Sequence, residues 1–250
     1  MNDNFVYGKN SVLEILTTKP NRINKILISN NLRFDTKINN IIDLAKENKV
    51  LYQITPKEKF LIYKEYNHQG IIAFVSPIEY TDLDDFLETA PPNAKLLALD
   101  GVQDPHNLGA IIRTCVCAKF DGIILAQHKN TLVTPIVEKT SAGATNHIPI
   151  IVVNSLSNAV ERLKKYDYWI IASDARGKDN YFEVDYTDMN IVLVLGSEGF
   201  GVSKTILNAA DITVKIPMLC DFNSLNVSNA AAILIYEVVK QVVQKSKNIV

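Results

Sequence analysis

Three segments of the chain together carry glycine, amide, hydroxyl and charged residues, and each lies after an apolar run. They are residues 107–114 (NLGAIIRT), 195–201 (LGSEGFG) and 216–229 (IPMLCDFNSLNVSN). Each follows a stretch that predicts a buried strand. Because the carboxyl ends of parallel strands meet at one edge of a sheet, we expect the three segments to line one crevice. Such a crevice is the expected place for a ligand site.

The third segment holds more amide and hydroxyl groups than one helix start requires. Pro217 ends the strand before it, and Val227 begins a long predicted helix. The start of this helix carries Asn223, Ser224, Asn226, Ser228 and Asn229. A helix N-cap uses one such side chain. The surplus favours a ligand site, although a capped helix after a turn would also fit.

The elements that position these segments have the pattern of an α/β domain. Near-continuous apolar strands are expected at residues 96–99, 122–126, 148–153, 169–173, 191–195 and 212–216. Helices are expected to start near residues 108, 135, 155, 203 and 227. Strands without polar alternation are buried on both faces, which predicts a parallel sheet covered by helices. The glycines of residues 196–201 do not have the dinucleotide-binding spacing, which disfavours a nucleotide-dependent metabolic enzyme on a doubly wound sheet.

Residues 1–75 predict a separate, small α/β unit. Helices are expected at 8–18, 35–48 and 56–63, and strands at 25–29, 50–54 and 71–75. Residues 76–93 are rich in proline and acidic side chains and predict a linker with a short docked helix around Leu83 and Phe86. Residues 94–250 then form the second domain.

Composition places few limits on the function. The formal net charge is −1, and 47% of the residues are hydrophobic. Residues 1–80 carry 11 Lys and Arg against 8 Asp and Glu, which makes the first part mildly basic. Three cysteines, a polar start and no long apolar run predict a cytoplasmic protein without a membrane partner. No spacing of His and Cys predicts a metal site.

Taken together, the three segments resemble the sequence motifs of the SpoU/TrmH family of RNA ribose 2′-O-methyltransferases, which belong to the SPOUT class. All three motifs occur in order, and with the N-terminal part included the resemblance covers nearly the whole chain. It implies a SPOUT domain with a deep trefoil knot, preceded by a small ribosomal-protein-like RNA-binding domain. The chain most resembles the subfamily that methylates a guanosine ribose in 23S ribosomal RNA.

The resemblance also implies a cofactor, S-adenosylmethionine, and the residues that hold it. Backbone groups around Gly196, Ile216 and Leu225 would bind this cofactor. A glycine at position 196 is physically sensible, because a residue without Cβ lets a ligand approach the backbone closely.

The same resemblance assigns polar side chains to the RNA substrate. Arg113 would grip the phosphate of the target nucleotide, since its guanidinium fork suits two oxygens. Glu198 would orient Arg113 through a charge-assisted hydrogen bond. Asn107, Ser224 and Asn226 would fix the ribose and the cofactor carboxylate by hydrogen bonds, whereas Ser228 is expected to be only a helix cap.

The last predicted helix is apolar on all sides over residues 230–235. A helix with one buried face would show a single stripe, so two faces are expected to be covered, the second one by another chain. The resemblance likewise implies a homodimer, built on this helix and on residues 107–114. Structured RNA is the implied substrate. A transfer-RNA ribose methyltransferase and a non-catalytic RNA-binding ribosome-assembly factor remain the alternatives.

Overall fold

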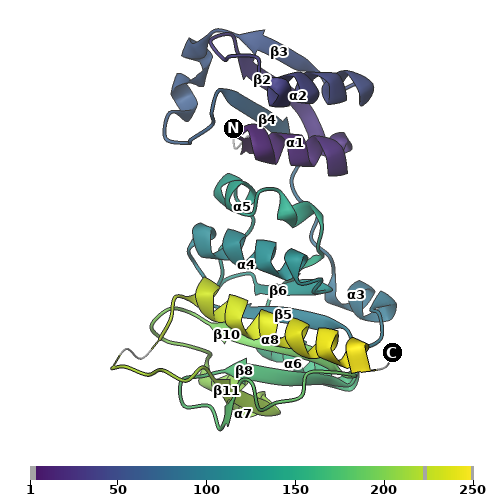
Figure 1. Ribbon diagram of the computed structural model, residues 1–250, viewed down its shortest axis with the longest axis vertical. Helices are drawn as coiled ribbons and strands as arrows, with labels where there is room; N and C mark the ends of the chain where they lie inside the picture. The colour runs from purple at the N-terminus through teal and green to yellow at the C-terminus, as the bar shows by residue number, and fades with distance from the viewer. Residues whose placement is uncertain (1–3, 222–223, 249–250) are drawn as a thin grey trace. The chain divides into compact units, whose positions relative to one another are not determined.

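The computed structural model describes residues 4–221 and 224–248 and contains two compact units (Figure 1). The first comprises Met1–Glu79 and Val133–His147, and the second comprises Tyr80–Leu132 and Ile148–Val250. Sequence analysis divided the chain into residues 1–75, 76–93 and 94–250. The structure differs by grouping residues 133–147 with the N-terminal unit.

The first unit is built on a four-stranded sheet with the order β1-β4-β2-β3. Its strands are β1 (Phe5–Tyr7), β2 (Ile23–Ser29), β3 (Tyr52–Thr55) and β4 (Ile71–Val75). Alternate residues face opposite sides, and the apolar faces of α1 (Lys9–Thr18) and α2 (Thr36–Glu47) cover one of them. The 3₁₀ helix η2 (Lys57–Tyr63) contributes to a smaller hydrophobic cluster on the other side of the sheet. A second 3₁₀ helix, η1 (Pro20–Arg22), precedes β2. The expected helices and strands are confirmed, and β1 and η1 are additional.

A buried ion pair fastens residues 133–147 into this unit, where they form α5 (Pro135–Thr140) and η3 (Ala144–Asn146). Arg22 Nη2 donates to Glu138 Oε1 at 3.0 Å, and Arg22 Nη1 donates to Asn146 Oδ1 at 2.6 Å. The side chains of Arg22 and Glu138 are only 13% and 6% exposed. Removing either partner would leave an uncompensated buried charge, which is strongly destabilising.

The second unit contains a seven-stranded sheet with the order β7-β6-β5-β10-β8-β11-β9. Its strands are β5 (Lys95–Asp100), β6 (Gly122–Ala126), β7 (Ile150–Val153), β8 (Tyr168–Ser173), β9 (Asp179–Asn180), β10 (Asn190–Gly196) and β11 (Ile212–Lys215). All neighbouring strands run parallel. The predicted α/β class with a parallel sheet is therefore confirmed. The short strand β9 was not expected.

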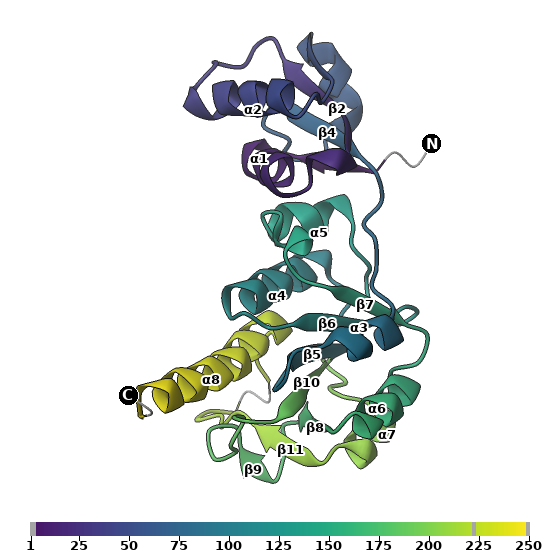
Figure 2. The ribbon, with the colours of Figure 1, turned by 90° about the vertical axis from the view of Figure 1, so that its right-hand side faces the viewer.

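Helices cover both faces of this sheet, as Figure 2 shows. On one face lie α3 (Leu83–Thr89), α6 (Leu156–Lys165) and α7 (Lys204–Ala209). On the other face lie α4 (Pro105–Cys117) and α8 (Val227–Asn248), which pack against each other. None of the helices within the described ranges combines the length and the apolar character needed to cross a bilayer.

The order of the strands reverses between β5 and β10, which are neighbours in space but far apart in the chain. Their carboxyl ends are level, because Gly196 is paired with Asp100. In open α/β sheets, ligands bind in the crevice beyond such a switch point. The trefoil knot that the resemblance implies stays a prediction.

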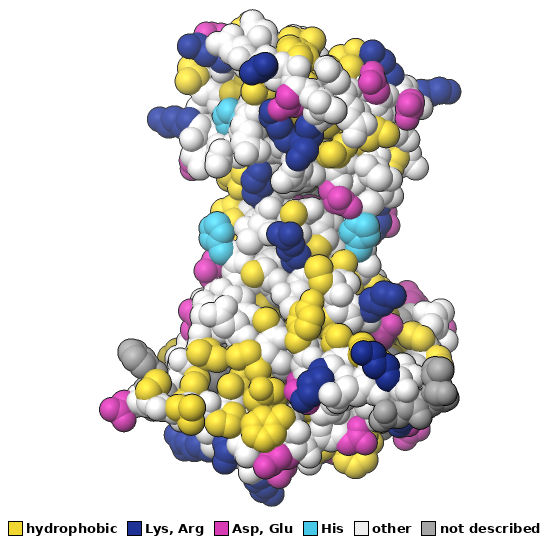
Figure 3. Space-filling view, viewed as in Figure 1, with side chains coloured by type: hydrophobic (Ala, Val, Ile, Leu, Met, Phe, Trp, Pro, Cys, Tyr) yellow, Lys and Arg dark blue, Asp and Glu magenta, His cyan; other side chains and the backbone are white. Residues whose placement is uncertain are grey.

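Helix α8 has one side in the core and one side exposed. Leu234, Ile235 and Val238 are buried, whereas Tyr236 is 50% exposed and Val243 is 46% exposed. The two exposed residues are seven apart, so they lie on the same side of the helix. Figure 3 shows a cluster of hydrophobic side chains on the face of the unit that α8 crosses.

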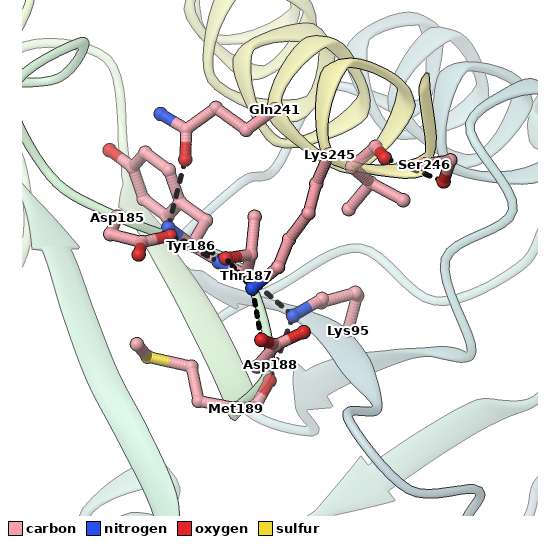
Figure 4. A network of polar contacts seen from close by, with 10 residues as sticks. Lys95, Asp185, Tyr186, Thr187, Asp188, Met189, Gln241, Lys245 and Ser246 are labelled. Carbon is pink, nitrogen blue, oxygen red and sulfur yellow. Dashed lines mark hydrogen bonds and ion pairs between the residues drawn. The ribbon is translucent and has the colours of Figure 1, made fainter. Parts of the chain in front are cut away.

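The carboxyl-terminal half of α8 is fixed to the amino end of the sheet by a polar network (Figure 4). Lys95 Nζ donates to the carbonyl oxygens of Tyr186 at 2.7 Å and Met189 at 2.8 Å. Gln241, on α8, accepts a hydrogen bond from the Tyr186 backbone nitrogen at 3.0 Å. Burial lowers the pKa of the Lys95 ammonium. The helix is thus held at this end, while its amino terminus lies at the carboxyl ends of the strands.

Candidate active site

One residue from each of the three polar segments joins a closed triangle of hydrogen bonds. Asn107 Nδ2 donates to Glu198 Oε1 at 2.8 Å. Asn226 Nδ2 donates to the same Glu198 oxygen at 2.8 Å and to Asn107 Oδ1 at 3.0 Å. The expectation that the segments meet beyond the strand ends is therefore confirmed for these three residues.

The starts of two helices hold the two asparagines of the triangle. Asn107 is the third residue of α4, whose N-cap Asp104 accepts a hydrogen bond from the His106 backbone nitrogen. Asn226 immediately precedes α8, and its Oδ1 accepts from the Ser228 nitrogen at 2.8 Å and from Ser228 Oγ at 2.6 Å. Ser228 was expected to be the cap of α8. The structure shows that Asn226 provides the accepting oxygen and that Ser228 donates to it.

A tight loop after β10 places Glu198. Ser197 and Gly201 close this loop by exchanging two backbone hydrogen bonds of 3.2 and 3.0 Å. A Cβ atom on Gly196 would lie 1.8 Å from the carbonyl carbon of Gly201. Sequence analysis related Gly196 to the close approach of a ligand. The structure gives a different reason for the glycine, because the space beside it is filled by the backbone of the chain itself.

Asp100, at the end of β5, attaches this loop to the neighbouring strand. Its Oδ2 accepts from the Ser203 backbone nitrogen at 2.9 Å, and its Oδ1 accepts from Lys129 Nζ at 2.9 Å. Burial raises the pKa of the Asp100 carboxyl, but the hydrogen bonds from Ser203 and Lys129 outweigh burial and hold this pKa below its ordinary value. Asp100 is therefore a charged carboxylate that fixes the start of α7.

Asn130 performs a similar task for the turn after β5. Its Oδ1 accepts from the backbone nitrogens of Gly101 at 3.0 Å and Val102 at 2.7 Å, and its Nδ2 donates to the Leu99 carbonyl at 2.8 Å. Neither Asp100 nor Asn130 was among the residues expected at the site. The signal was available, because both lie at or just beyond the carboxyl end of an expected strand, the criterion that identified the three segments.

A pocket of about 470 Å³ opens beside the triangle, entirely within the second unit. Its wall includes Asn107, Glu198, His128, Lys129 and Phe200. The described residues contain no group of three or more His, Cys, Asp or Glu side chains arranged to hold a metal ion. The polar side-chain groups on the wall that can orient a ligand are thus amides, carboxylates, a hydroxyl, an imidazole and an ammonium.

Arg113 does not join the triangle. It lies on the exposed side of α4, whereas Asn107 is buried. The two residues are six positions apart, a helical rotation that falls about 120° short of two full turns. Arg113 forms no hydrogen bond or ion pair with any other residue that the structure describes. The expected Glu198–Arg113 bond is therefore wrong for the single chain, since Glu198 binds the two asparagine amides instead.

The remaining predicted site residues lie beyond β11, on the approach to α8. Ser224 is exposed and has no hydrogen-bond partner among the described residues, Ile216 is half-buried, and Leu225 is 37% exposed. Asn223, which sequence analysis also noted, lies outside the described residues. Nearby Leu219 is completely exposed. This segment therefore presents apolar side chains that the chain itself does not cover.

Comparison with known proteins places the chain in a family. Residues 94–236 match the family model of the SpoU rRNA methylase family. The chain belongs to the SpoU rRNA methylase family. Residues 5–81 match the model for RNA 2′-O ribose methyltransferase substrate binding. A protein of Staphylococcus saprophyticus named as a TrmH family tRNA/rRNA methyltransferase is 38% identical over 244 residues, which cover 96% of this chain and 97% of that protein.

Two solved structures with a bound cofactor share the fold over nearly the whole chain. The SpoU methyltransferase AviRb from Streptomyces viridochromogenes, in complex with AdoMet, has a TM-score of 0.81 and 21% identity over 96% of this chain and 90% of that one. An AdoMet-bound rRNA methyltransferase from Sinorhizobium meliloti has a TM-score of 0.79 and 23% identity over 95% and 87%. The chain is thus a SpoU-family RNA methyltransferase with an N-terminal domain of the substrate-binding type.

Proposed function

We propose that this protein methylates a ribose 2′-hydroxyl of RNA, that of a guanosine in 23S ribosomal RNA, with S-adenosylmethionine as methyl donor. The observation that carries the proposal is the triangle of Asn107, Glu198 and Asn226, two of which, Asn107 and Glu198, line a pocket at the strand switch point. The match of residues 5–81 to a 2′-O ribose methyltransferase substrate-binding model supports ribose as the acceptor. Transfer RNA is the second candidate substrate, because the staphylococcal relative is named for both RNAs.

The segment beyond β11 fits an adenosine-containing cofactor. Leu219 and Leu225 are exposed apolar side chains in the same segment as the half-buried Ile216, and an adenine ring would cover such groups. Backbone groups at Gly196 lie at the same end of the sheet. Bound here, S-adenosylmethionine supplies an electrophilic methyl group. The residues of the chain hold it and align the hydroxyl group that attacks.

Glu198 is the residue best placed to orient that hydroxyl. Its Oε1 atom is occupied by the two amide hydrogens from Asn107 and Asn226, whereas its Oε2 atom accepts no hydrogen bond among the described residues. A carboxylate oxygen left free on a pocket wall can accept a hydrogen bond from a ribose hydroxyl. The asparagines keep the carboxylate in place, so the triangle is a positioning device for the acceptor.

We further propose a homodimer formed through α8 and α4. Tyr236 and Val243 form an exposed apolar stripe on α8, which a second chain would cover. Arg113 is exposed on α4, the helix that packs beside α8. In the dimer, Arg113 would hold a substrate phosphate at the site of the partner chain. This arrangement accounts for the absence of any bond between Arg113 and the triangle of its own chain.

Mixed dimers test whether Arg113 acts across the interface. R113A and N226A are each expected to be inactive alone, because each removes one half of every composite site. Mixing the two in equal amounts and allowing exchange should restore activity at about a quarter of the sites, since half of the dimers are mixed and each has one intact site. An inactive mixture, with exchange verified by mass spectrometry of tagged chains, would place Arg113 in the site of its own chain.

Methyl transfer to defined RNAs tests the function itself. The purified protein would be incubated with labelled S-adenosylmethionine and either a 23S ribosomal RNA transcript or transfer RNA, and the products would be analysed as nucleosides by mass spectrometry. We expect 2′-O-methylguanosine from the ribosomal RNA. Label in transfer RNA alone would select the second candidate. No label in either RNA, with S-adenosylmethionine binding intact, would favour a non-catalytic RNA-binding assembly factor.

The proposed setting of the protein is the cytoplasm, where ribosomal RNA would be accessible to it. Cys115, Cys117 and Cys220 are all free thiols, as a reducing compartment requires. Fractionation of cells followed by detection of the protein tests this assignment. Recovery with the membranes would contradict it.

A further inference from the structure

Phe200 is an aromatic side chain that the structure leaves almost completely in solvent. It is 95% exposed, and it lies in the loop between β10 and α7 that carries Glu198. Leaving such a side chain unburied forgoes the hydrophobic stabilisation that burial would give. We therefore expect a ligand or a partner surface to cover Phe200, which lies in the same loop as the pocket carboxylate of Glu198.

The loop holds Phe200 in a defined place. Gly199 and Gly201, on either side, have φ angles of 90° and 66°, a region that residues with side chains rarely adopt. The two backbone hydrogen bonds between Ser197 and Gly201 close the loop around them. Beneath it, the backbone of Gly201 packs directly against Gly196. The phenyl ring is thus carried by a closed turn seated on the end of β10.

The surroundings of Phe200 have the chemistry that a nucleotide needs. The ring lines the same pocket as Asn107 and Glu198, so a group in contact with it lies next to the triangle. Lys129 and His128 line another part of this wall, and the Lys129 side chain is 56% exposed. A flat ring that shares a pocket with an exposed cation suits a base attached to a phosphate, because bases stack on aromatic faces and phosphates bind ammonium groups.

We propose that Phe200 is a stacking platform for a nucleobase of the RNA substrate, either the base of the target nucleotide or one beside it. The proposal rests on the proposed function, because it assumes that RNA enters this pocket. Stacking holds the base by its face and leaves the ribose free to approach Glu198. Single-stranded RNA is commonly recognised by bases that stack on exposed aromatic side chains.

Three substitutions separate stacking from other contacts. F200A removes the ring, F200L keeps an apolar group without a π-face, and F200Y keeps the ring. Loss of one base–aromatic stack corresponds to about 5-fold to 150-fold weaker binding. We expect F200A and F200L to weaken binding of a 23S ribosomal RNA transcript by this factor and F200Y to stay within threefold of the parent. S-adenosylmethionine affinity and the unfolding midpoint should not change in any of them.

Phe182 provides the matched control, because it is a 48% exposed phenylalanine in the same unit that does not line the pocket. F182A should bind the RNA as the parent does. Equal binding by F200A and the parent would overturn the proposal, and so would equal binding by F200L and F200Y. A lower molecular mass of F200A in light scattering would identify Phe200 as an interface residue between two chains and would also overturn it.

Fluorescence gives a readout that does not depend on methyl transfer. Trp169 is the only tryptophan in the sequence, so a W169F/F200W double variant reports from position 200 alone. Adding the 23S ribosomal RNA transcript should quench this fluorescence saturably, because a stacked base quenches tryptophan. Methylation by the parent without quenching in the variant would overturn the stacking proposal alone. Quenching without methylation of either RNA by the parent would contradict the proposed function alone.

Discussion

Gly196→Ala is the substitution whose effect the structure defines most sharply. The added Cβ would lie 1.8 Å from the Gly201 carbonyl carbon and 2.0 Å from its oxygen. Ordinary van der Waals contact begins at 3.4 Å, so the two backbone segments must separate by about 1.6 Å. Neither segment is a flexible side chain that could rotate away. The loop after β10 must therefore open.

The size of the effect follows from what the opening breaks. Ser197 and Gly201 exchange two backbone hydrogen bonds, each contributing about 1 kcal/mol to stability, and overpacking typically costs about 1–3 kcal/mol. We expect the free energy of unfolding of the second unit to fall by about 3–5 kcal/mol, the sum of these two contributions. Glu198 moves with the loop, and a displacement of about 1 Å in a reacting constellation can cost roughly 100-fold in rate.

The assay compares G196A with G199A. Gly199 has nothing within 4 Å of its Cβ position, so alanine there meets only the unfavourable φ of 90°. Urea unfolding, calorimetric titration with S-adenosylmethionine and single-turnover methylation of the RNA would be measured for both. G196A should lose far more activity than G199A. A G196A enzyme with parental stability and a rate within threefold of the parent would refute the reasoning.

Three further perturbations test other parts of the molecule. R113A should lower turnover by roughly 100-fold to 10,000-fold while binding S-adenosylmethionine normally. R113K should recover little of the lost rate, because an ammonium lacks the guanidinium fork. An R113A rate within threefold of the parent rate would contradict the role assigned to Arg113. D100N should be less stable than the parent at pH 7, because it loses the charge that Ser203 and Lys129 stabilise. The folded-state pKa of Asp100 is depressed, so the stability that its carboxylate contributes is present above about pH 4 and is lost as pH falls through that pKa. The free energies of unfolding of the parent and D100N, measured in urea, should therefore differ less at pH 3 than at pH 7. An equal difference at both pH values would contradict this role of Asp100. K95M should destabilise the second unit by about 1–3 kcal/mol, because it leaves the carbonyl groups of Tyr186 and Met189 without their donor. If urea unfolding gave K95M the same stability as the parent, water would replace Lys95 as the donor.

The local pattern of the sequence predicted the elements and one edge of the site. Buried strands without polar alternation predicted the parallel sheet, and the rule that their carboxyl ends meet predicted the convergence of Asn107, Glu198 and Asn226. This rule did not predict the position of Arg113, because the side of α4 on which Arg113 lies depends on the helical rotation between it and Asn107. The six-residue spacing already carried that information.

Other features depend on contacts that are distant in the chain, and local pattern could not supply them. The reason for the glycine at 196 is the backbone of Gly201, which returns to it only after the loop closes. The strands β1 and β9 are too short to show a periodicity, and they exist because neighbouring strands pair with them. The grouping of residues 133–147 with the N-terminal unit likewise rests on Arg22, a partner more than a hundred residues away.

That ion pair has a consequence for the order of events during synthesis. Arg22 and Glu138 are separated by 116 residues, so the N-terminal unit cannot be completed when its own sheet has emerged from the ribosome. At roughly 5–20 residues per second, Glu138 follows Arg22 by about 6–23 s. During that interval Arg22 lacks its carboxylate partner, and by its end the nascent chain contains β5 and β6 of the next unit. The N-terminal unit therefore completes its folding only after residues 133–147 are synthesised, and in the sequence these residues lie between two parts of the second unit.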